Sequence, residues 1–174
     1  LARRSGAVIG VDCVDEMLDK CRDNLGLARS VNSWLTEEMI DLRQGDALAL
    51  PIADATVGLF AQNCLFNVFR EADLTTALSE AHRVLVPGGA LSMSDPVCNQ
   101  AIPQALQDDP RLRAACLSGA LPLDDYLARV VAAGFGMIEV RARRPYRVLD
   151  TRRYDVEEHL FLESVEIVAY KTEV

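Results

Sequence analysis

The distribution of hydrophobic residues predicts strands that alternate with helices along most of the chain. Short apolar runs predict buried strands, at residues 7–12, 40–46, 57–64 and 90–94. Between and after them, apolar residues recur every three or four positions and predict helices, at residues 14–28, 72–86, 103–116 and 123–133. Two longer apolar runs predict strands that finish the chain, at residues 137–148 and 161–171.

Alternating strands and helices indicate right-handed βαβ units, which build a parallel sheet with helices packed on it. No helix is predicted between the last two strands, so one antiparallel strand is expected near the C-terminus. The sequence contains no internal repeat and no linker-like stretch. The pattern therefore predicts an α/β fold in a single domain over residues 1–174, with a mostly parallel sheet.

Composition narrows the classes of function. Half of the 174 residues are hydrophobic and a quarter are charged, as in soluble globular proteins, and the formal net charge is −8. An acidic chain is a poor partner for nucleic acid or for an anionic membrane. No apolar run approaches the roughly 18 residues of a membrane span, and no secretory signal opens the chain. Five cysteines are too few and too irregular for a disulfide framework, so we expect a cytoplasmic protein with free thiols.

Polar and thiol-bearing residues follow the predicted strands. In an open α/β sheet, ligands bind in the crevice beyond the carboxyl ends of the strands. The residues at these ends include aspartates, cysteines and asparagines: Asp12, Cys13, Asp46, Asn63, Cys64, Asn67, Asp95 and Cys98. Packing alone would favour Val or Ile where a buried strand ends, so this set predicts a binding site.

Asp12 and Asp46 are candidate nucleotide-binding acids. A carboxylate between a strand and a helix accepts hydrogen bonds from ribose hydroxyls in nucleotide-binding folds. Asp12 could equally cap the following helix, and both interpretations stay open. The carboxylate of Asp46 and the backbone N–H of Ala47 suit the amino group and a ring nitrogen of adenine.

Several segments, taken in order, resemble the motifs of class I S-adenosylmethionine-dependent methyltransferases. These segments are GVDCVDEML, GDALALP, QNCLFN and RVLVPGG followed by LSMSD. The resemblance implies a Rossmann-like sheet and S-adenosylmethionine as cofactor. It also implies cofactor-binding positions, which are Asp12 at the ribose, Met17 near the adenosine, Asp46 and Ala47 at the adenine, and Asn63 at the methyl-donor site.

Further segments narrow the resemblance to the arsenite methyltransferases, especially the branch linked to arsenosugar biosynthesis. They are NCLFNVF, SDPVC, DPRLRAACLSGALPLDDYL and RARRPYRVLD. In this family, an asparagine-flanked thiol and a cysteine before a GAL segment bind As(III). The resemblance thus implies Cys64 and Cys116 as arsenic ligands and reaction centre, with Cys98 as a candidate third ligand. The implied substrate is arsenite or its thiol adduct, and a thiol reductant is an implied partner.

The chemistry of arsenic agrees with this assignment. As(III) is soft and thiophilic, and its lone pair can attack a sulfonium methyl group in line. Such a reaction needs alignment more than acid–base catalysis. The chain has only two histidines, His82 and His159, and we interpret His82 as a helix-surface or packing residue and not as a base.

The cysteines also have a structural interpretation. Free cysteine usually behaves as a small buried hydrophobe, which we expect of Cys21 and favour for Cys13. Cys64 and Cys116 are 52 positions apart and form no metal motif, so without the resemblance they would be ordinary thiols. Two alternatives therefore remain. One is a methyltransferase for a small organic molecule with structural cysteines, and the other is a non-catalytic fragment that binds thiophilic metalloids.

The chain departs from the methyltransferase pattern at its start. Only six residues precede residue 7, and the family's first strand with its Gly-rich turn is absent. We expect an N-terminally incomplete domain that binds S-adenosylmethionine weakly or not at all. Six arginines within residues 141–153 could bind nucleic acid, but the acidity of the chain favours a strand with a solvated face.

Overall fold

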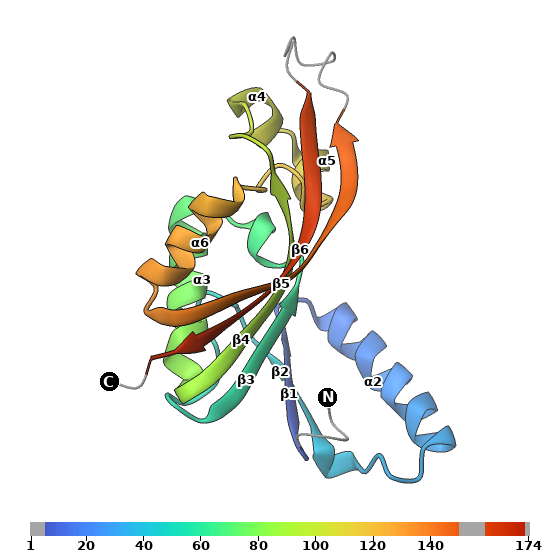
Figure 1. Ribbon diagram of the computed structural model, residues 1–174. Helices are drawn as coiled ribbons and strands as arrows, with labels where there is room; N and C mark the ends of the chain where they lie inside the picture. The colour runs from blue at the N-terminus through green and yellow to red at the C-terminus, as the bar shows by residue number, and fades with distance from the viewer. Residues whose placement is uncertain (1–5, 150–158, 173–174) are drawn as a thin grey trace. The chain divides into compact units, whose positions relative to one another are not determined.

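The computed structural model describes residues 6–149 and 159–172. The chain divides into two compact units, Leu1–Ile52 and Ala53–Val174. The first unit holds a two-stranded sheet and the second a four-stranded sheet (Figure 1). This division does not test the prediction of a single domain, which stays a prediction.

The first unit is a βαβ element. Strands β1 (Val8–Asp12) and β2 (Ile40–Gln44) pair in parallel, with Asp12 opposite Gln44. Helix α2 (Asp15–Val31) and a 3-10 turn, η1 (Glu37–Met39), connect them. Acidic residues occupy the first turn of α2 and Arg29 the last, as the helix dipole favours. Both strands and the helix were predicted within a few residues of these bounds.

The second unit is built on a sheet with the strand order β3-β4-β6-β5. Strand β3 (Val57–Asn63) runs parallel to β4 (Leu85–Cys98). Strand β6 (Leu160–Lys171) runs antiparallel to β4 and to β5 (Phe135–Leu149). The expected antiparallel strand is therefore β6.

The prediction of a mostly parallel sheet is not confirmed. Because β6 lies between β4 and β5, this one reversed strand forms two antiparallel ladders. The parallel ladders are also two in number, β1/β2 and β3/β4. The four-stranded sheet is mixed, whereas the two-stranded sheet is parallel. The α/β class itself is confirmed.

Helices α3 (Glu71–Val84) and α6 (Leu123–Ala132) lie on the same side of the four-stranded sheet (Figure 1). Helix α3 buries one apolar stripe, formed by Leu74, Ala77, Leu78, Ala81 and Val84. Its last turn packs His82 edge-on against Phe135, with ring centroids 5.3 Å apart, as the packing role predicted. Burial lowers the pKa of this imidazole.

Two predicted elements differ in extent from the structure. The strand expected at residues 90–94 begins at Leu85 and continues through Pro87-Gly88-Gly89, so the stop signal ends α3 without starting a loop. The helix expected at residues 103–116 is two short helices, α4 (Gln104–Gln107) and α5 (Pro110–Ala114). Pro110 begins the second one, and Asp109 caps it by accepting from the N–H of Arg111.

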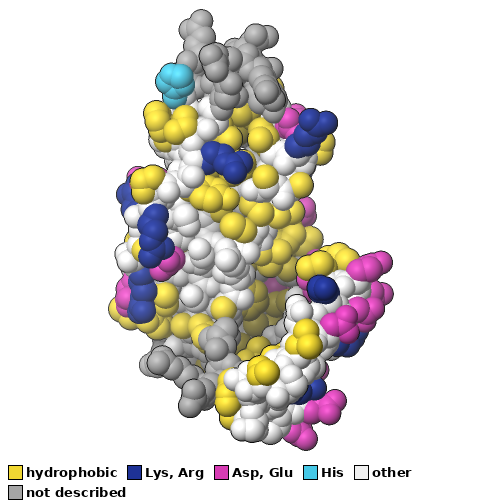
Figure 2. All heavy atoms as spheres, turned by 90° about the vertical axis from the view of Figure 1, so that its right-hand side faces the viewer, with side chains coloured by type: hydrophobic (Ala, Val, Ile, Leu, Met, Phe, Trp, Pro, Cys, Tyr) yellow, Lys and Arg dark blue, Asp and Glu magenta, His cyan; other side chains and the backbone are white. Residues whose placement is uncertain are grey.

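The surface of the second unit carries apolar side chains and paired charges. Figure 2 shows hydrophobic side chains gathered on the face turned to the viewer. Exposed apolar residues on the strands of this unit include Leu59, Met137, Val140, Val148 and Phe161.

None of the helices in the described ranges combines the length and apolar content that a bilayer crossing requires.

The arginine-rich segment pairs with glutamates. Arg143 and Arg144 of β5 form ion pairs with Glu163 and Glu166 of β6, and Arg141 pairs with Glu139 at 2.9 Å. These contacts fit the predicted solvated strand face. Arg152 and Arg153 lie outside the described residues.

Candidate functional site

Two acids stand at neighbouring strand ends in the first unit. Strand β1 ends at Asp12, and the N–H of Gly45, just after β2, donates to the carbonyl oxygen of Asp12 at 3.0 Å. A Cβ at Gly45 would lie 2.5 Å from the Pro51 Cδ, so only glycine allows this tight turn. The turn places Asp46 next to the end of β1.

Each of these carboxylates uses one oxygen to hold its own loop. Asp12 Oδ1 accepts from the N–H of Val14, and Asp46 Oδ1 accepts from the N–H of Leu48, both at 2.9 Å. The first contact is an Asx turn and not a helix cap, because Val14 is the N-cap of α2 and no side chain caps that helix. Within the described residues, the second oxygen of each carboxylate has no protein partner, so it can accept a hydrogen bond from a ligand.

The other two predicted adenosine contacts lie in the same unit. Met17, near the start of α2, has a side chain that is 56% exposed. Ala47 directly follows Asp46, and its N–H has no partner among the described residues. An exposed apolar side chain, two free carboxylate oxygens and a free amide fit an adenosine group. Asn63, the fifth predicted contact, is an exposed residue at the end of β3 in the second unit, opposite Ser94.

The second unit brings Cys64 and Cys116 together. Cys116 follows α5, and its Sγ donates to the carbonyl oxygen of Cys64 at 2.9 Å, although 52 positions separate the two residues. Both residues adopt left-handed backbone conformations, with φ of 57° and 58°. Such conformations cost free energy for a residue with a Cβ, and they cluster at functional sites.

Burial controls the acidity of both thiols. Burial, and after it the neighbouring Cys64, raises the pKa of Cys116 to about 11. Burial raises the pKa of Cys64 as well, together with the charge of Asp95. Both thiols are therefore protonated at neutral pH. Within the described residues, no group of three or more His, Cys, Asp or Glu side chains is arranged to hold a metal ion.

Asn67 joins the two cysteine-bearing segments. Its buried side-chain amide donates to the carbonyl oxygens of Pro96 and, at 3.5 Å, of Cys116. A Cβ at Gly119 would lie 2.0 Å from the Asn67 carbonyl oxygen, so the approach of the two segments leaves no room for a side chain at position 119. The sequence indicated Asn67 only as a polar neighbour of Cys64, and Gly119 only as part of the GAL segment, with no contact between the two.

A buried carboxylate lies behind the cysteines. Asp95 of β4 is 1% exposed, and its Oδ2 accepts from Tyr126 Oη at 2.7 Å and from Gln62 Nε2. Burial raises the pKa of Asp95, and burial with the neighbouring Asp95 raises that of Tyr126. Sequence reasoning placed Asp95 at a strand end but missed Gln62 and Tyr126, because these contacts join distant parts of the chain.

Cys98, the candidate third ligand, is a core residue. It is 4% exposed, and its Sγ lies 3.5 Å from Asn99 Oδ1. Its neighbours are hydrophobic and belong to one buried cluster: Ile102, Leu106, Leu117, Ala120, Leu149, Leu160 and Leu162. Burial raises the pKa of this thiol. These surroundings favour a packing role. Of the thiols in the first unit, Cys13 is exposed and Cys21 is partly buried.

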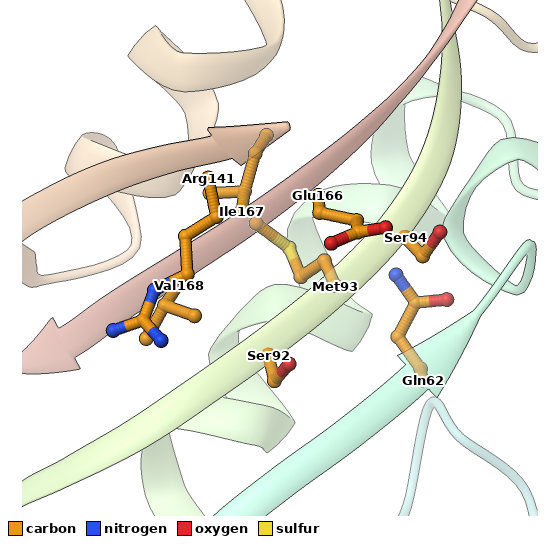
Figure 3. A pocket seen from close by; sticks show the side chains of 8 residues that line it. All are labelled: Gln62, Ser92, Met93, Ser94, Arg141, Glu166, Ile167 and Val168. Carbon is orange, nitrogen blue, oxygen red and sulfur yellow. The ribbon is translucent and has the colours of Figure 1, made fainter. Parts of the chain in front are cut away.

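A polar cavity of about 370 Å³ opens over the strands of the second unit (Figure 3). Its lining residues come from all four strands and are Gln62, Ser92, Met93, Ser94, Arg141, Glu166, Ile167 and Val168. In Figure 3, Gln62 and Ser94 lie near Glu166. Gln62 therefore belongs both to this cavity and to the hydrogen-bond network of Asp95.

Comparison with known proteins places the chain among methyltransferases. The profile of the methyltransferase domain family matches residues 1–93. The chain is 34% identical over 135 residues to an arsenite methyltransferase of Halobacterium salinarum, covering 78% of this chain and 32% of that protein. It is 39% identical over 84 residues to a demethylmenaquinone methyltransferase of Deinococcus radiodurans, covering 48% of this chain and 31% of that protein.

A solved structure shares the fold. The arsenic(III) S-adenosylmethionine methyltransferase of Chlamydomonas reinhardtii matches with a TM-score of 0.82 and 25% identity, covering 95% of this chain and 56% of that one. The chain thus spans about a third of the two curated relatives and about half of the solved protein. Because the family profile covers more than half of its residues, the chain belongs to the methyltransferase domain family, and it resembles the arsenite methyltransferases.

Proposed function

We propose that the chain takes part in methyl transfer from S-adenosylmethionine to arsenite bound by the thiols of Cys64 and Cys116. The observation that carries this proposal is the hydrogen bond between Cys116 Sγ and the Cys64 carbonyl oxygen, which brings two cysteine residues from distant segments into contact. The likeness to two arsenite methyltransferases supports the choice of substrate. A reducing cytoplasm, which keeps both thiols free, is part of the proposal.

Arsenite binding exchanges oxygen ligands for sulfur. Each As–S bond forms as one As–O bond breaks, and the thiol proton leaves with the hydroxide as water. Protonated thiols suit this exchange, since the two protons that are needed are already present on Cys64 and Cys116. Two protein sulfurs leave a third position on As(III), which a hydroxide or a small thiol can fill. We therefore include arsenite–thiol adducts among the substrates and a thiol reductant among the partners.

The cofactor, when bound, supplies an electrophilic methyl group for the arsenic lone pair. Asp12 and Asp46 would hold its ribose and adenine through their free oxygens, beside the free N–H of Ala47. Met17 would pack against the adenosine. Asn63 would contribute at the methyl-donor end. None of these residues needs to move a proton, because the attacking lone pair carries none.

Arsenic binding by the full chain tests this proposal. Arsenite is added to the wild-type protein and to Cys64→Ser, Cys116→Ser and Cys13→Ser variants, and protein-bound arsenic is measured after gel filtration. We expect both site variants to lose binding and Cys13→Ser, which changes an exposed thiol, to keep it. Wild-type amounts of arsenic on both site variants would contradict the proposal.

A second candidate function is methyl transfer to a small organic molecule. Two observations favour it: the likeness to demethylmenaquinone methyltransferases and the polar cavity in Figure 3. In this case the cysteines are structural, and Cys64→Ser keeps methyl transfer to the organic acceptor. A methylation assay that compares arsenite with a panel of phenolic and quinone acceptors distinguishes the two.

A further inference from the structure

A chain of hydrogen bonds links helix α6 to the segment that carries Cys64. Tyr126 Oη of α6 donates to Asp95 Oδ2 of β4 at 2.7 Å, and Gln62 Nε2 of β3 donates to the same oxygen. The other end of the Gln62 amide, Oε1, accepts from the N–H of Leu65 at 2.8 Å. This series of hydrogen bonds therefore ends at Leu65, the residue that directly follows Cys64.

Asp95 occupies a position where a hydrophobic residue would be expected. Its neighbours on the same face of β4, Met93 and Val97, are both 2% exposed. A buried carboxylate costs free energy unless hydrogen bonds compensate for lost water. Here one oxygen has two donors, whereas Oδ1 has no partner among the described residues. Packing alone does not account for an acid at this position.

The segment after β3 has a backbone conformation that hydrogen bonds must hold in place. Cys64 has a φ of 57°, which a residue with a Cβ adopts only when the surrounding structure fixes it. Its own N–H donates to the Ser94 carbonyl oxygen at 2.8 Å, and the next N–H, that of Leu65, donates to Gln62. Two successive amides are thus fixed by β4, one directly and one through Gln62 and Asp95.

We propose that Asp95 is a positioning residue, which acts through Gln62 to hold Cys64 in the left-handed conformation that faces Cys116. Its effect on arsenic rests on the proposed function. Its effect on the main chain does not, because the hydrogen bond from Leu65 is a property of the protein alone. The two effects can therefore be measured separately.

Four variants of the full chain separate positioning from general stability. Asp95→Leu removes both acceptor oxygens, whereas Asp95→Asn keeps one oxygen for Tyr126 and Gln62. Gln62→Met removes the hydrogen bond from Gln62 to Asp95 and the one from Leu65 to Gln62, leaves the Tyr126–Asp95 hydrogen bond, and serves if Asp95→Leu fails to fold. Ser118→Ala is the matched control, because Ser118 is 3% exposed, lies near Cys116 in the chain and has a side-chain hydroxyl with no hydrogen-bond partner within the described residues.

Amide hydrogen exchange of Leu65 is the first measurement. We expect its exchange to be about tenfold faster in Asp95→Leu and Gln62→Met, as for the loss of one buried hydrogen bond, with the α3 amides unchanged. Asp95→Asn and Ser118→Ala should match the wild type. Unchanged Leu65 exchange in both Asp95→Leu and Gln62→Met would overturn the proposal.

Arsenite affinity is the second measurement. It should fall about tenfold in the same two variants and stay near wild type in Asp95→Asn and Ser118→Ala. An equal loss in Ser118→Ala would show a general effect of destabilisation and overturn the positioning role. If wild-type protein binds no arsenite through Cys64 and Cys116, the proposed function fails, while the exchange data still decide whether Asp95 positions the segment.

Discussion

Gly119 lies directly against the main chain of Asn67, close in sequence to one of the paired cysteines. A Cβ added at Gly119 would lie 2.0 Å from the Asn67 carbonyl oxygen and 2.8 Å from its carbonyl carbon. Since the obstacle is backbone, no side-chain rotation can relieve it. The absence of a Cβ at position 119 therefore allows the segment of Cys116 to reach the segment of Cys64.

Gly119→Ala should separate the two segments. We expect the free energy of unfolding to fall by about 1–3 kcal/mol, as for other overpacked sites, and arsenite binding to weaken with it. Chemical denaturation and arsenite titration measure the two effects. Gly58→Ala is the control, because nothing lies within 4 Å of a Cβ at Gly58. A Gly119→Ala protein as stable as that control would refute the steric argument.

Asn67→Asp should destabilise the protein at neutral pH. The substitution replaces an amide donor by a carboxylate that faces the carbonyl oxygens of Pro96 and Cys116, so repulsion replaces two hydrogen bonds. We expect a loss of about 1–3 kcal/mol in urea unfolding. Asn63→Asp makes the same chemical change at an exposed position and should leave stability nearly unchanged.

The reactivity of Cys116 should depend on pH in a defined direction. Because burial, together with the neighbouring Cys64 and Asp95, raises its pKa from the ordinary 9.0 to about 11, alkylation by iodoacetamide should be slow at pH 8 and increase between pH 9 and 11. The folded state holds this proton more tightly than the unfolded state, so stability should fall over the same range. Peptide mass spectrometry follows the reaction, with exposed Cys13 as internal reference. Equal rates for the two thiols at pH 8 would contradict the burial argument.

Cys98→Ala tests whether this thiol packs or binds arsenic. A packing role predicts a loss of about 1–2 kcal/mol in stability, because a cavity forms within the hydrophobic cluster around it. Arsenite affinity should then stay within about twofold of wild type. A large loss of arsenite affinity with unchanged stability would instead identify Cys98 as a ligand.

Asp12→Asn and Asp46→Asn should weaken cofactor binding without unfolding the protein. Asparagine keeps an oxygen for the N–H of Val14 or of Leu48, so the loops persist, but the free oxygen is replaced by a donor. Ligand-observed NMR with S-adenosylmethionine detects weak binding and suits this comparison. We expect about a tenfold loss in each variant and none in Asp23→Asn, on the exposed side of α2.

Most of the fold followed from local patterns in the sequence. The strand ending at Asp12, the helix after it and the stop signal at Pro87-Gly88-Gly89 are all encoded within a few residues. The break between α4 and α5 also had a local signal, an aspartate followed by proline, which was missed. The placement of β6 between β4 and β5 is a non-local pairing, and no local pattern specifies it.

The candidate site was less accessible from sequence. The pairing of Cys64 with Cys116 followed from family resemblance alone, since a spacing of 52 positions carries no geometric information. The contacts of Asp95 with Gln62 and Tyr126 join residues 33 and 31 positions apart in the sequence. A tyrosine on an amphipathic helix is usually interpreted as a core residue, so Tyr126 gave no sign of this contact. Hydrogen bonds between distant elements depend on how the sheet aligns, which periodicity does not determine.

The left-handed backbone at Cys64 and Cys116 sets sulfur chemistry against folding stability. Glycine adopts this conformation without steric penalty. Replacing either cysteine by glycine would therefore relieve the backbone strain and remove the soft sulfur donor. Selection for robustness alone would drift toward glycine at both places. Cysteine at these two positions therefore keeps a strained backbone conformation together with a sulfur atom that can bind a soft ligand.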